Sequence, residues 1–408
     1  MKVPQCLNTD FFKTVVRNGF HLTDFQIADA KIEIGTSAGD NYCSTIYRVF
    51  LSIIDSQANH QKVQFLIKHL LSSDTGESLM KFMHTFGKEV DMIKNIMPRL
   101  TKITGGTQFV ARFYHSYSEP QSNMIIVQDL KELQYRMADR KEALDYDHCC
   151  VALTKLGQMH AASMILTQDN PSLMDNYKFG ILHGSENNPG LIQQILGANY
   201  PALCKVSKNW VGFEDISQKL NDMQDKFWRI VYECQLGKND KYKVLNHGDF
   251  WINNFLFKYN EETGKPIDTL FVDLQLSYYA SPANDLQYFL NTSPQIQIRR
   301  HQREDLLRVY YKSFRQTLRE LNHKIIPTFD DLLAEVRQWE MFGFMSAVFV
   351  LPLVLMEKQS TQGSGIDGLV DPEAVQEMTQ IMFSGKRFTE AMQEILRRCD
   401  EMKLFDSL

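Results

Sequence analysis

Runs rich in β-branched and aromatic residues mark the first 130 residues of the chain as strand-forming. Such residues fit a pleated, half-buried surface, so their clustering between turn residues favours strands. Five strands are predicted, at 30–35, 44–54, 62–71, 109–118 and 123–130.

The hydrophobic period changes between the third and fourth predicted strands. From Leu79 to Met97 apolar residues recur at steps of three and four, which is typical of an amphipathic helix. Pro98 is expected to end this helix. The order of elements therefore predicts one helix on an antiparallel sheet, in an N-terminal lobe of residues 1–128.

After Leu130 the pattern is mainly helical. Residues 170–215 are rich in loop formers, and the strongest strand signal is a hairpin, with strands at 255–259 and 268–276. We therefore predict an α+β fold with a mainly helical C-terminal lobe, residues 129–408. Helices are predicted at 147–166, 210–234, 284–291, 302–321, 329–356 and 371–398.

Composition narrows the class of protein. A chain of 408 residues is long enough for two lobes. The net charge of −5 gives no support for a nucleic-acid surface. The seven cysteines are scattered and form no CxxC pair, so a zinc site or a set of disulfides is not expected. Free cysteines favour a reducing compartment, and a cytoplasmic location is therefore predicted. The uncharged run 341–356 is shorter than the roughly 20 residues of a membrane span and contains Pro352, so a buried helix is expected.

One polar stretch, "NHGDFWINN" (246–254), interrupts two apolar runs just before the hairpin. Its spacing is typical of phosphoryl transfer, with Asp249 to accept or orient a hydroxyl proton and Asn254 to bind a metal ion. Mg²⁺ needs few protein oxygen ligands, and Asp273 in "FVDLQ", at the end of the hairpin, supplies a carboxylate. The alternative is structural, with His247 and Asn254 as turn formers and Asp249 as a cap.

The N-terminal half contains a candidate phosphate anchor. Lys68 is a lone cation in the apolar run "FLIKHL", and buried lysines are rare unless they are paired. Glu89 on the following helix is the preferred partner, and Asp91 is the competing one. The alternative is a lysine on an exposed strand face.

The segment "GTSAGDNYCS" (35–44) lies where a loop that covers phosphates belongs. Backbone N–H groups with Ser37, Asn41 and Ser44 could bind phosphate oxygens, although a plain β-turn would have the same composition. In "VQDL", Asp129 and Leu130 form the predicted crossover between lobes, where backbone groups would bind adenine.

Asp285 opens a predicted helix after Pro282. It is either a simple N-cap or a group that braces the catalytic loop, with His247 as another supporting residue. Trp251, inside the motif, is a candidate contact for the acceptor substrate.

The acceptor is expected against the helical lobe. Phe344 and Met345 lie in the apolar segment 339–356, and such large, adaptable side chains line ligand pockets. The loop region 171–215 is the other candidate. The alternative is that 339–356 is a core helix, because a helix that is apolar all round is usually buried.

These segments together resemble the ecdysteroid-kinase-like family, from about residue 30 to residue 400. The segments are "GTSAGDNYCSTIYRV", "FLIKHL", "FGKEVDMI", "IIVQDL", "LGQMHAASM", "NHGDFWINNFLF", "FVDLQ" and "SPANDLQYFL". The family is similar to choline kinases and aminoglycoside phosphotransferases and has a protein-kinase-like fold. Gly248 and Gln275 differ from the HND and D-x-E patterns of choline kinases. The loop reads G-D-N-Y where G-E-N-Y is more usual.

The resemblance implies a set of roles and cofactors. The lobe of residues 1–128 would bind the nucleotide, and the lobe of residues 129–408 would carry the catalytic loop and the acceptor pocket. Asp249 would be the catalytic base, Asn254 and Asp273 the magnesium ligands, and Lys68 the phosphate anchor held by Glu89. ATP and Mg²⁺ would be the cofactors, and the substrate would be a small, largely apolar alcohol such as an ecdysteroid or another steroidal or xenobiotic alcohol.

Two other functions fit the same fold. A protein kinase is disfavoured, because no DFG or APE segment is present and "VDLQ" leads directly into "LSYYASPAND". A catalytically silent protein that binds a hydrophobic hormone is the second. Only the intact set of Asp249, Asn254 and Asp273 disfavours it.

Overall fold

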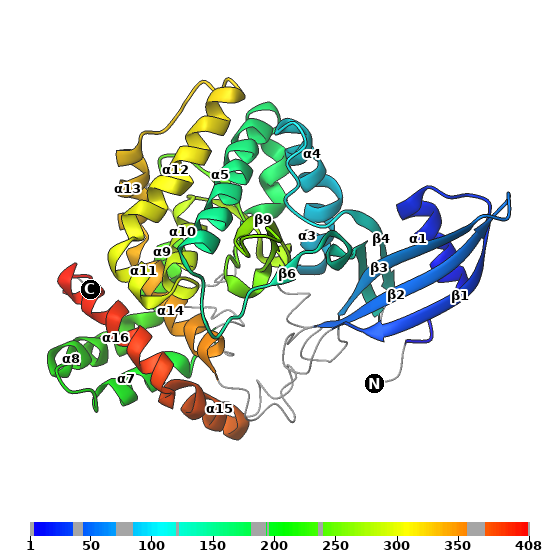
Figure 1. Ribbon diagram of the computed structural model, residues 1–408. Helices are drawn as coiled ribbons and strands as arrows, with labels where there is room; N and C mark the ends of the chain where they lie inside the picture. The colour runs from blue at the N-terminus through cyan, green and yellow to red at the C-terminus, as the bar shows by residue number, and fades with distance from the viewer. Residues whose placement is uncertain are drawn as a thin grey trace.

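An antiparallel sheet forms one end of the molecule and a group of helices forms the other (Figure 1). The computed structural model describes residues 4–35, 44–70, 85–119, 122–180, 196–235, 240–356 and 372–406, together with Gln193. The predicted α+β fold, an N-terminal antiparallel sheet followed by a mainly helical region, is confirmed.

The N-terminal sheet has five strands in the order β1-β2-β3-β5-β4, and all pairs are antiparallel. Side chains on β2 and β3 alternate between buried and partly exposed, as expected for strands with one face on a core. The predicted strands are all present, and β1 begins earlier than expected because it is a largely exposed edge strand. The bounds are β1 (Phe25–Ile34), β2 (Ser44–Asp55), β3 (His60–Leu70), β4 (Phe113–Glu119) and β5 (Ser122–Gln128).

A helix that the sequence interpretation did not predict, α1 (Thr9–Phe20), covers one face of this sheet. Asn8 caps it by accepting hydrogen bonds from the N–H groups of Asp10 and Phe11. Phe12 and Val16 are among its buried residues and pack with the sheet in a separate N-terminal core.

The helix predicted between β3 and β4 is described from Thr85 onward, so Leu79 lies outside the described residues. It runs as α3 (Thr85–Asp91), a π-helical turn η1 (Met92–Ile96) and α4 (Met97–Ile103). Pro98 does not end it, contrary to expectation. Pro98 lies in the first turn of α4, where a missing N–H group is tolerated.

The connection after β5 is short. The 3₁₀ turn η2 (Leu130–Leu133) follows directly, and β6 (Arg136–Met137) pairs with the hairpin of β8 (Phe255–Tyr259) and β9 (Pro266–Phe271). The predicted hairpin is present, but its second strand ends at Phe271 rather than at residue 276, because residues 274–276 form a 3₁₀ turn. The lobe boundary at residues 128 and 129 stays a prediction.

The helical region is organised around a long buried helix, α5 (Tyr146–Asp169), and the helix α12 (Arg303–Glu320) that packs on it. Three predicted helices are broken. Residues 210–234 form α8, η4 and α9, residues 329–356 form α13 and α14, which meet at 55°, and residues 371–398 form α15 and α16. The bounds are η3 (Pro171–Tyr177), α7 (Asn199–Ser207), α8 (Glu214–Asp222), η4 (Gln224–Lys226), α9 (Phe227–Gln235), α10 (Ala283–Thr292), α11 (Ile296–His301), α13 (Phe329–Gln338), α14 (Glu340–Leu355), α15 (Pro372–Ser384) and α16 (Lys386–Glu401).

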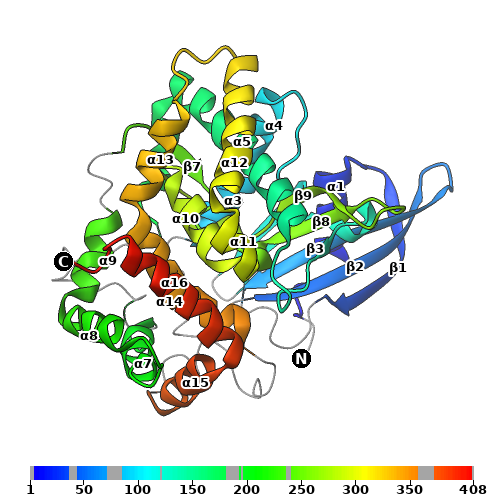
Figure 2. The same cartoon turned by 60° about the vertical axis from the view of Figure 1, so that its left-hand side comes forward.

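The predicted buried helix at 341–356 is α14, and almost all of its side chains are buried. It packs against α10 and α16, and Figure 2 shows α16 lying along it. Among the described residues one helix, Tyr146–Gln168, is as long and apolar as a membrane span, and 67% of that window is buried inside the protein. Such burial is expected of a core helix.

Candidate active site

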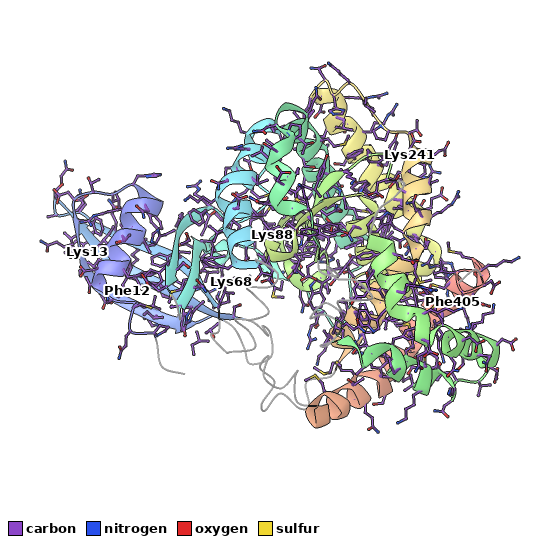
Figure 3. The ribbon with its side chains drawn as sticks, turned by 180° about the vertical axis from the view of Figure 1, so that it is seen from behind. Phe12, Lys13, Lys68, Lys88, Lys241 and Phe405 are labelled. Atoms are coloured by element: carbon purple, nitrogen blue, oxygen red, sulfur yellow. The ribbon has the colours of Figure 1, made fainter. Side chains whose placement is uncertain are left out.

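A cleft of about 560 Å³ lies between the N-terminal sheet and the helical region. Lys68 lies at this junction (Figure 3), and the cleft also contains Asp249, Asn254 and Asp273. One part of its wall is apolar and suits a flat, weakly polar ring system. The apolar lining includes Val110, Ala111, Ile125, Val127, Leu256 and Phe271.

The polar stretch 246–254 forms a loop between two strand pairs. It follows β7 (Val244–Asn246), which pairs with β10 (Tyr278–Ala280), and it ends in the 3₁₀ turn η5 (Ile252–Asn254) before β8. Gly248 has φ +83°, and a Cβ atom there would lie 2.0 Å from the carbonyl oxygen of Leu276. Only glycine fits this close approach.

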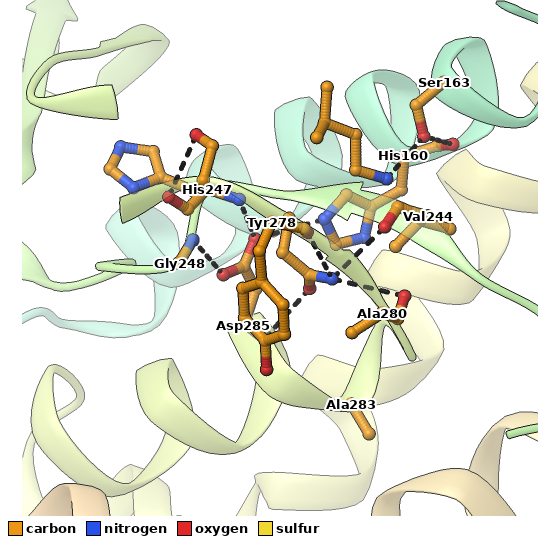
Figure 4. A network of polar contacts seen from close by, with 12 residues as sticks. His160, Ser163, Val244, His247, Gly248, Tyr278, Ala280, Ala283 and Asp285 are labelled. Carbon is orange, nitrogen blue, oxygen red and sulfur yellow. Dashed lines mark hydrogen bonds and ion pairs between the residues drawn. The ribbon is translucent and has the colours of Figure 1, made fainter. Parts of the chain in front are cut away.

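Asp285 holds the backbone of this loop from below (Figure 4). Its carboxylate accepts hydrogen bonds from His247 N at 2.7 Å and from Gly248 N at 2.9 Å. Asp285 lies in the first turn of α10 and is fully buried. The bracing contact expected from the sequence is therefore present, and the simple N-cap alternative does not describe it.

His160 on α5 joins the same network. Its Nε2 atom lies 3.2 Å from Asp285 and its Nδ1 atom 2.9 Å from the hydroxyl of Tyr310. Burial lowers the pKa of His160, although the Asp285 carboxylate acts in the opposite direction. The network thus links α5, α10 and α12 beneath the loop.

His247 is held by its backbone and by both ring nitrogens. Its own N–H bonds to Asp285, its Nε2 atom lies 3.0 Å from the carbonyl oxygen of Val272, and its Nδ1 atom accepts from Asp249 N at 3.3 Å. A carbonyl only accepts, so Nε2 must carry the proton and Nδ1 must be the acceptor. This ring joins the loop to the end of β9.

Two donors hold the carboxylate of Asp249. Tyr288 donates its hydroxyl proton to Oδ1 at 2.5 Å, and Asn254 Nδ2 donates to Oδ2 at 2.9 Å. Burial and the charge of Asp273 raise the pKa of Asp249, while Tyr288, His247 and Asn254 lower it. The carboxylate is fixed in orientation at the edge of the cleft.

Lys68 pairs with two carboxylates. Its Nζ atom lies 2.9 and 2.8 Å from the two oxygens of Glu89, and 2.8 Å from Asp273 Oδ1. The pairing with Glu89 expected from the sequence is present. Asp91 instead accepts hydrogen bonds from Tyr177 and Asn95.

The charged groups of this cluster shift one another's pKa values. Burial alone would lower the pKa of Lys68, but Asp273 and Glu89 outweigh it and raise this pKa. Burial and the charge of Asp273 raise the pKa of Glu89, while Lys68 opposes them. The side chain of Glu89 is 3% exposed and that of Asp273 is 30% exposed. Asp273 is therefore the carboxylate that a ligand in the cleft can reach.

Asp273 has left-handed backbone angles, φ 66° and ψ 63°, a strained region for a residue other than glycine. The neighbouring Val272 N donates to Asn254 O at 3.0 Å and joins the two candidate ligand residues. Because Asn254 Nδ2 is bonded to Asp249, its Oδ1 atom is the one available for a cation. A carboxylate and an amide oxygen suit Mg²⁺, which keeps several waters.

The side chain of Asp129 is directed to the sheet. It accepts hydrogen bonds from Arg48 Nε at 2.5 Å, from Gln64 Nε2 and from Lys131 N. Burial opposes these bonds, but the net effect is a lowered pKa for Asp129. The Asp129 carboxylate therefore already has hydrogen-bond donors within the protein. Asp129 and Leu130 can contribute their backbone groups and the Leu130 side chain to the cleft.

The remaining predicted site residues differ in whether they line the cleft. Ser44 and Trp251 line the cleft, whereas Ser37 and Asn41 lie outside the described residues. Phe344 and Met345 are completely buried. The Phe344 ring packs against Tyr200 and Phe405, a geometry that favours the core-helix alternative. The role of Phe344 and Met345 in substrate binding stays a prediction.

Two residues of the site were not predicted from the sequence. Tyr288 is followed by Phe289 and Leu290 on α10, and His160 by Ala161 and Ala162 on α5, so both resembled ordinary core positions. A polar atom on the buried face of each helix was the available signal, because a buried hydroxyl or imidazole needs a partner.

Comparison with known proteins assigns the family. The model of the ecdysteroid kinase-like family matches residues 38–323, and the chain belongs to this family. No curated protein matches. A crystal structure of a proposed fructosamine-3-kinase from Haemophilus somnus 129PT is 12% identical, with a TM-score of 0.39, over 90% of this chain and 96% of that one. A likeness this weak supports no conclusion about function.

Proposed function

We propose that this protein transfers the γ-phosphoryl group of ATP to a hydroxyl of a small, largely apolar molecule. An ecdysteroid or another steroidal or xenobiotic alcohol is the proposed acceptor. The observation that carries the proposal is the convergence of Lys68, Asp249, Asn254 and Asp273 on one cleft. Membership of the ecdysteroid kinase-like family supports a small-molecule phosphotransferase.

Each residue has a role that follows from its contacts. Asp249, held by Tyr288 and Asn254, accepts the proton of the attacking hydroxyl and orients its oxygen toward the γ-phosphorus atom. Lys68 binds phosphate oxygens from a position fixed by Glu89.

Asn254 Oδ1 and Asp273 would hold Mg²⁺, which when bound neutralises charge on the phosphates. In the free protein one carboxylate oxygen of Asp273 accepts a hydrogen bond from Lys68 Nζ. Nucleotide binding would therefore exchange the Lys68–Asp273 contact for contacts of each residue with Mg·ATP.

The reaction breaks two bonds and forms two. The alcohol oxygen forms a bond to the γ-phosphorus atom, and the bond from that atom to the ADP oxygen breaks. The alcohol proton passes to the Asp249 carboxylate. Positioning supplies most of the rate in such transfers, because the phosphoryl group itself carries little covalent chemistry for the protein.

The test is a screen of the purified protein with Mg·ATP against steroidal and plant-derived alcohols, with the mass of each alcohol as the readout. We expect at least one alcohol to gain one phosphoryl group, and only when both Mg²⁺ and ATP are present. If no alcohol gains mass, the proposal fails.

A catalytically silent hormone-binding protein is the alternative, and thermal unfolding separates it from the kinase. A ligand at 100 times its dissociation constant stabilises a protein by about 2.7 kcal/mol. A kinase is stabilised by Mg·ATP, whereas the silent protein responds to the apolar ligand alone.

A further inference from the structure

Tyr288 is the group that contacts the candidate base from inside the protein. Its hydroxyl lies 2.5 Å from Asp249 Oδ1, and the residue is only 4% exposed. Its ring is packed in the main core beside Phe289 and Leu290. A phenylalanine would satisfy that packing, so the hydroxyl needs a separate explanation.

We propose that Tyr288 is a positioning residue for phosphoryl transfer, which fixes the orientation of the Asp249 carboxylate toward the acceptor hydroxyl. The inference rests on the proposed function. It adds a residue that does not touch the substrate and acts only through the base.

The two bonds to Asp249 define its plane. Tyr288 holds Oδ1, and Asn254 Nδ2 holds Oδ2 at 2.9 Å. With one donor on each oxygen, the carboxylate cannot rotate about its Cβ–Cγ bond without breaking a short hydrogen bond. Each oxygen still has a lone pair for the acceptor hydroxyl.

One face of helix α10 holds both the side chain of Asp249 and the backbone of the loop that carries it. Asp285 and Tyr288 are three residues apart on α10, so their side chains lie on one face. Asp285 accepts from His247 N and Gly248 N, while Tyr288 donates to the side chain of Asp249. Helix α10 is therefore a single rigid support for the base.

The rigidity of α10 makes this arrangement effective. All ten of its residues are buried, and it packs against α14. Arg299 donates to its Asn291 carbonyl oxygen, and Gln287 donates to the carbonyl oxygen of Val336. A base held by a well-packed helix keeps the sub-ångström placement that transfer requires.

Tyr288 also remains a donor throughout the reaction. Burial, together with the adjacent Asp249 charge, raises its pKa well above 10.0. Its proton therefore stays on the phenol, and the proton that Asp249 receives comes from the alcohol. The hydroxyl of Tyr288 positions the base and is not consumed.

A purely structural hydrogen bond is the competing explanation, and the protein contains a matched example. Tyr177 is also completely buried, and its hydroxyl donates to Asp91 at 2.6 Å. Tyr177→Phe thus removes the same kind of bond without touching Asp249. It is the control for Tyr288→Phe.

The experiment is a double-mutant cycle of Tyr288→Phe and Asp249→Asn, assayed with Mg·ATP and the best alcohol of the panel. We expect Tyr288→Phe to lower kcat by about 10- to 100-fold, the range of a hydrogen bond to a charged group. The KM for ATP should change by less than about twofold, because Tyr288 contacts the base and not the nucleotide. In the Asp249→Asn background the second substitution should have almost no further effect.

Other outcomes overturn the inference. A kcat for Tyr288→Phe within about twofold of that of Tyr177→Phe makes the bond structural. Equal effects of Tyr288→Phe in both backgrounds mean that it does not act through Asp249. If the wild type phosphorylates no alcohol, the proposed function itself fails, which is a separate result.

A second substitution covers the case in which Tyr288→Phe does not fold. Replacing Tyr288 by 4-aminophenylalanine keeps the ring and a weaker donor. We expect a kcat between those of the wild type and the Asp249→Asn variant. A kcat equal to that of the wild type would contradict a role that depends on the strength and length of the Tyr288–Asp249 bond.

Discussion

Lys68 and Asp273 are 205 residues apart in the sequence, yet Lys68 Nζ donates a hydrogen bond to Asp273 Oδ1 at 2.8 Å. A lysine ammonium has three N–H donors, and Glu89 accepts from the same atom through both of its oxygens. In the free protein Lys68 is therefore fully used by two carboxylates. A nucleotide must compete with Asp273 for one of these donors.

The first prediction concerns Asp273→Ala. This substitution removes the proposed anionic metal ligand and releases one Lys68 donor. Mg·ATP should bind more than about tenfold more weakly, which is about 1.4 kcal/mol, whereas ATP without metal should bind no more weakly than to the wild type. Calorimetric titration with Mg²⁺ and with a chelator measures both. Unchanged Mg·ATP affinity would remove Asp273 from the metal site.

The second prediction concerns the stability of Lys68→Met. The substitution leaves Glu89, which is 3% exposed, without its cation. Loss of one partner from a buried ion pair costs about 3–5 kcal/mol. The exposed pair of Lys265 and Asp147 is the control, and Lys265→Met should cost less than about 1 kcal/mol.

The pH dependence of this loss follows from Glu89. Burial raises the pKa of Glu89 above its ordinary 4.5, and removal of Lys68 raises it further. Below pH 4.5 Glu89 is protonated in both folded and unfolded states, so the variant loses little from this group. Both proteins lose stability as Glu89 of the unfolded chain ionises above pH 4.5. The extra loss of the variant grows once the pH passes the raised pKa of Glu89 in the folded wild type, because Lys68 lets the wild type ionise first. Chemical unfolding between pH 4 and pH 8 should show this trend, and the reverse trend would contradict it.

The third prediction concerns Gly248→Ala. An added Cβ atom would lie 2.0 Å from the carbonyl oxygen of Leu276, so the loop must move away from Leu276. Gly264→Ala is the control, because Gly264 also has positive φ but no atom within 4 Å of the added group. The control should lose about 1–2 kcal/mol in a denaturant titration, and Gly248→Ala clearly more. Equal losses would mean that the loop adapts freely.

Local sequence patterns predicted the parts of the site that depend on spacing. Asp249 and Asn254 belong to one short motif, and Asp273 follows from a hairpin that begins right after it. Lys68 and Glu89 were predicted because an unusual cation in an apolar strand needs an acidic partner. These inferences required only neighbours along the chain or one strand-to-helix connection.

Parts that depend on packing were not predictable in the same way. Tyr288 lies among apolar residues on α10, and its hydroxyl meets Asp249 only after the helix has packed beneath the loop. Pro98 was expected to end a helix, but the π-helical turn before it places it in a tolerated position. Phe344 shows another limit of sequence patterns. A large apolar side chain is common to pockets and cores, and only tertiary contacts distinguish them.

The fourth prediction therefore concerns Phe344→Ala. Phe344 is fully buried against Tyr200 and Phe405, and loss of a buried phenylalanine ring costs about 3–5 kcal/mol. The folded fraction should keep its KM for the alcohol. Ile325→Ala, at a residue that is 69% exposed, should change neither stability nor KM. A raised KM for the alcohol alone would restore Phe344 to the acceptor pocket.

Phosphoryl transfer by Asp249→Asn is the most direct test of the account. The amide keeps the shape of the side chain but cannot accept the alcohol proton, so transfer from Mg·ATP to the best alcohol of the panel should fall about 10²–10⁴-fold. The affinity for Mg·ATP, measured on the same preparations, should stay close to that of the wild type. A variant that phosphorylates the alcohol within about tenfold of the wild-type rate would contradict the assignment of Asp249 as the base.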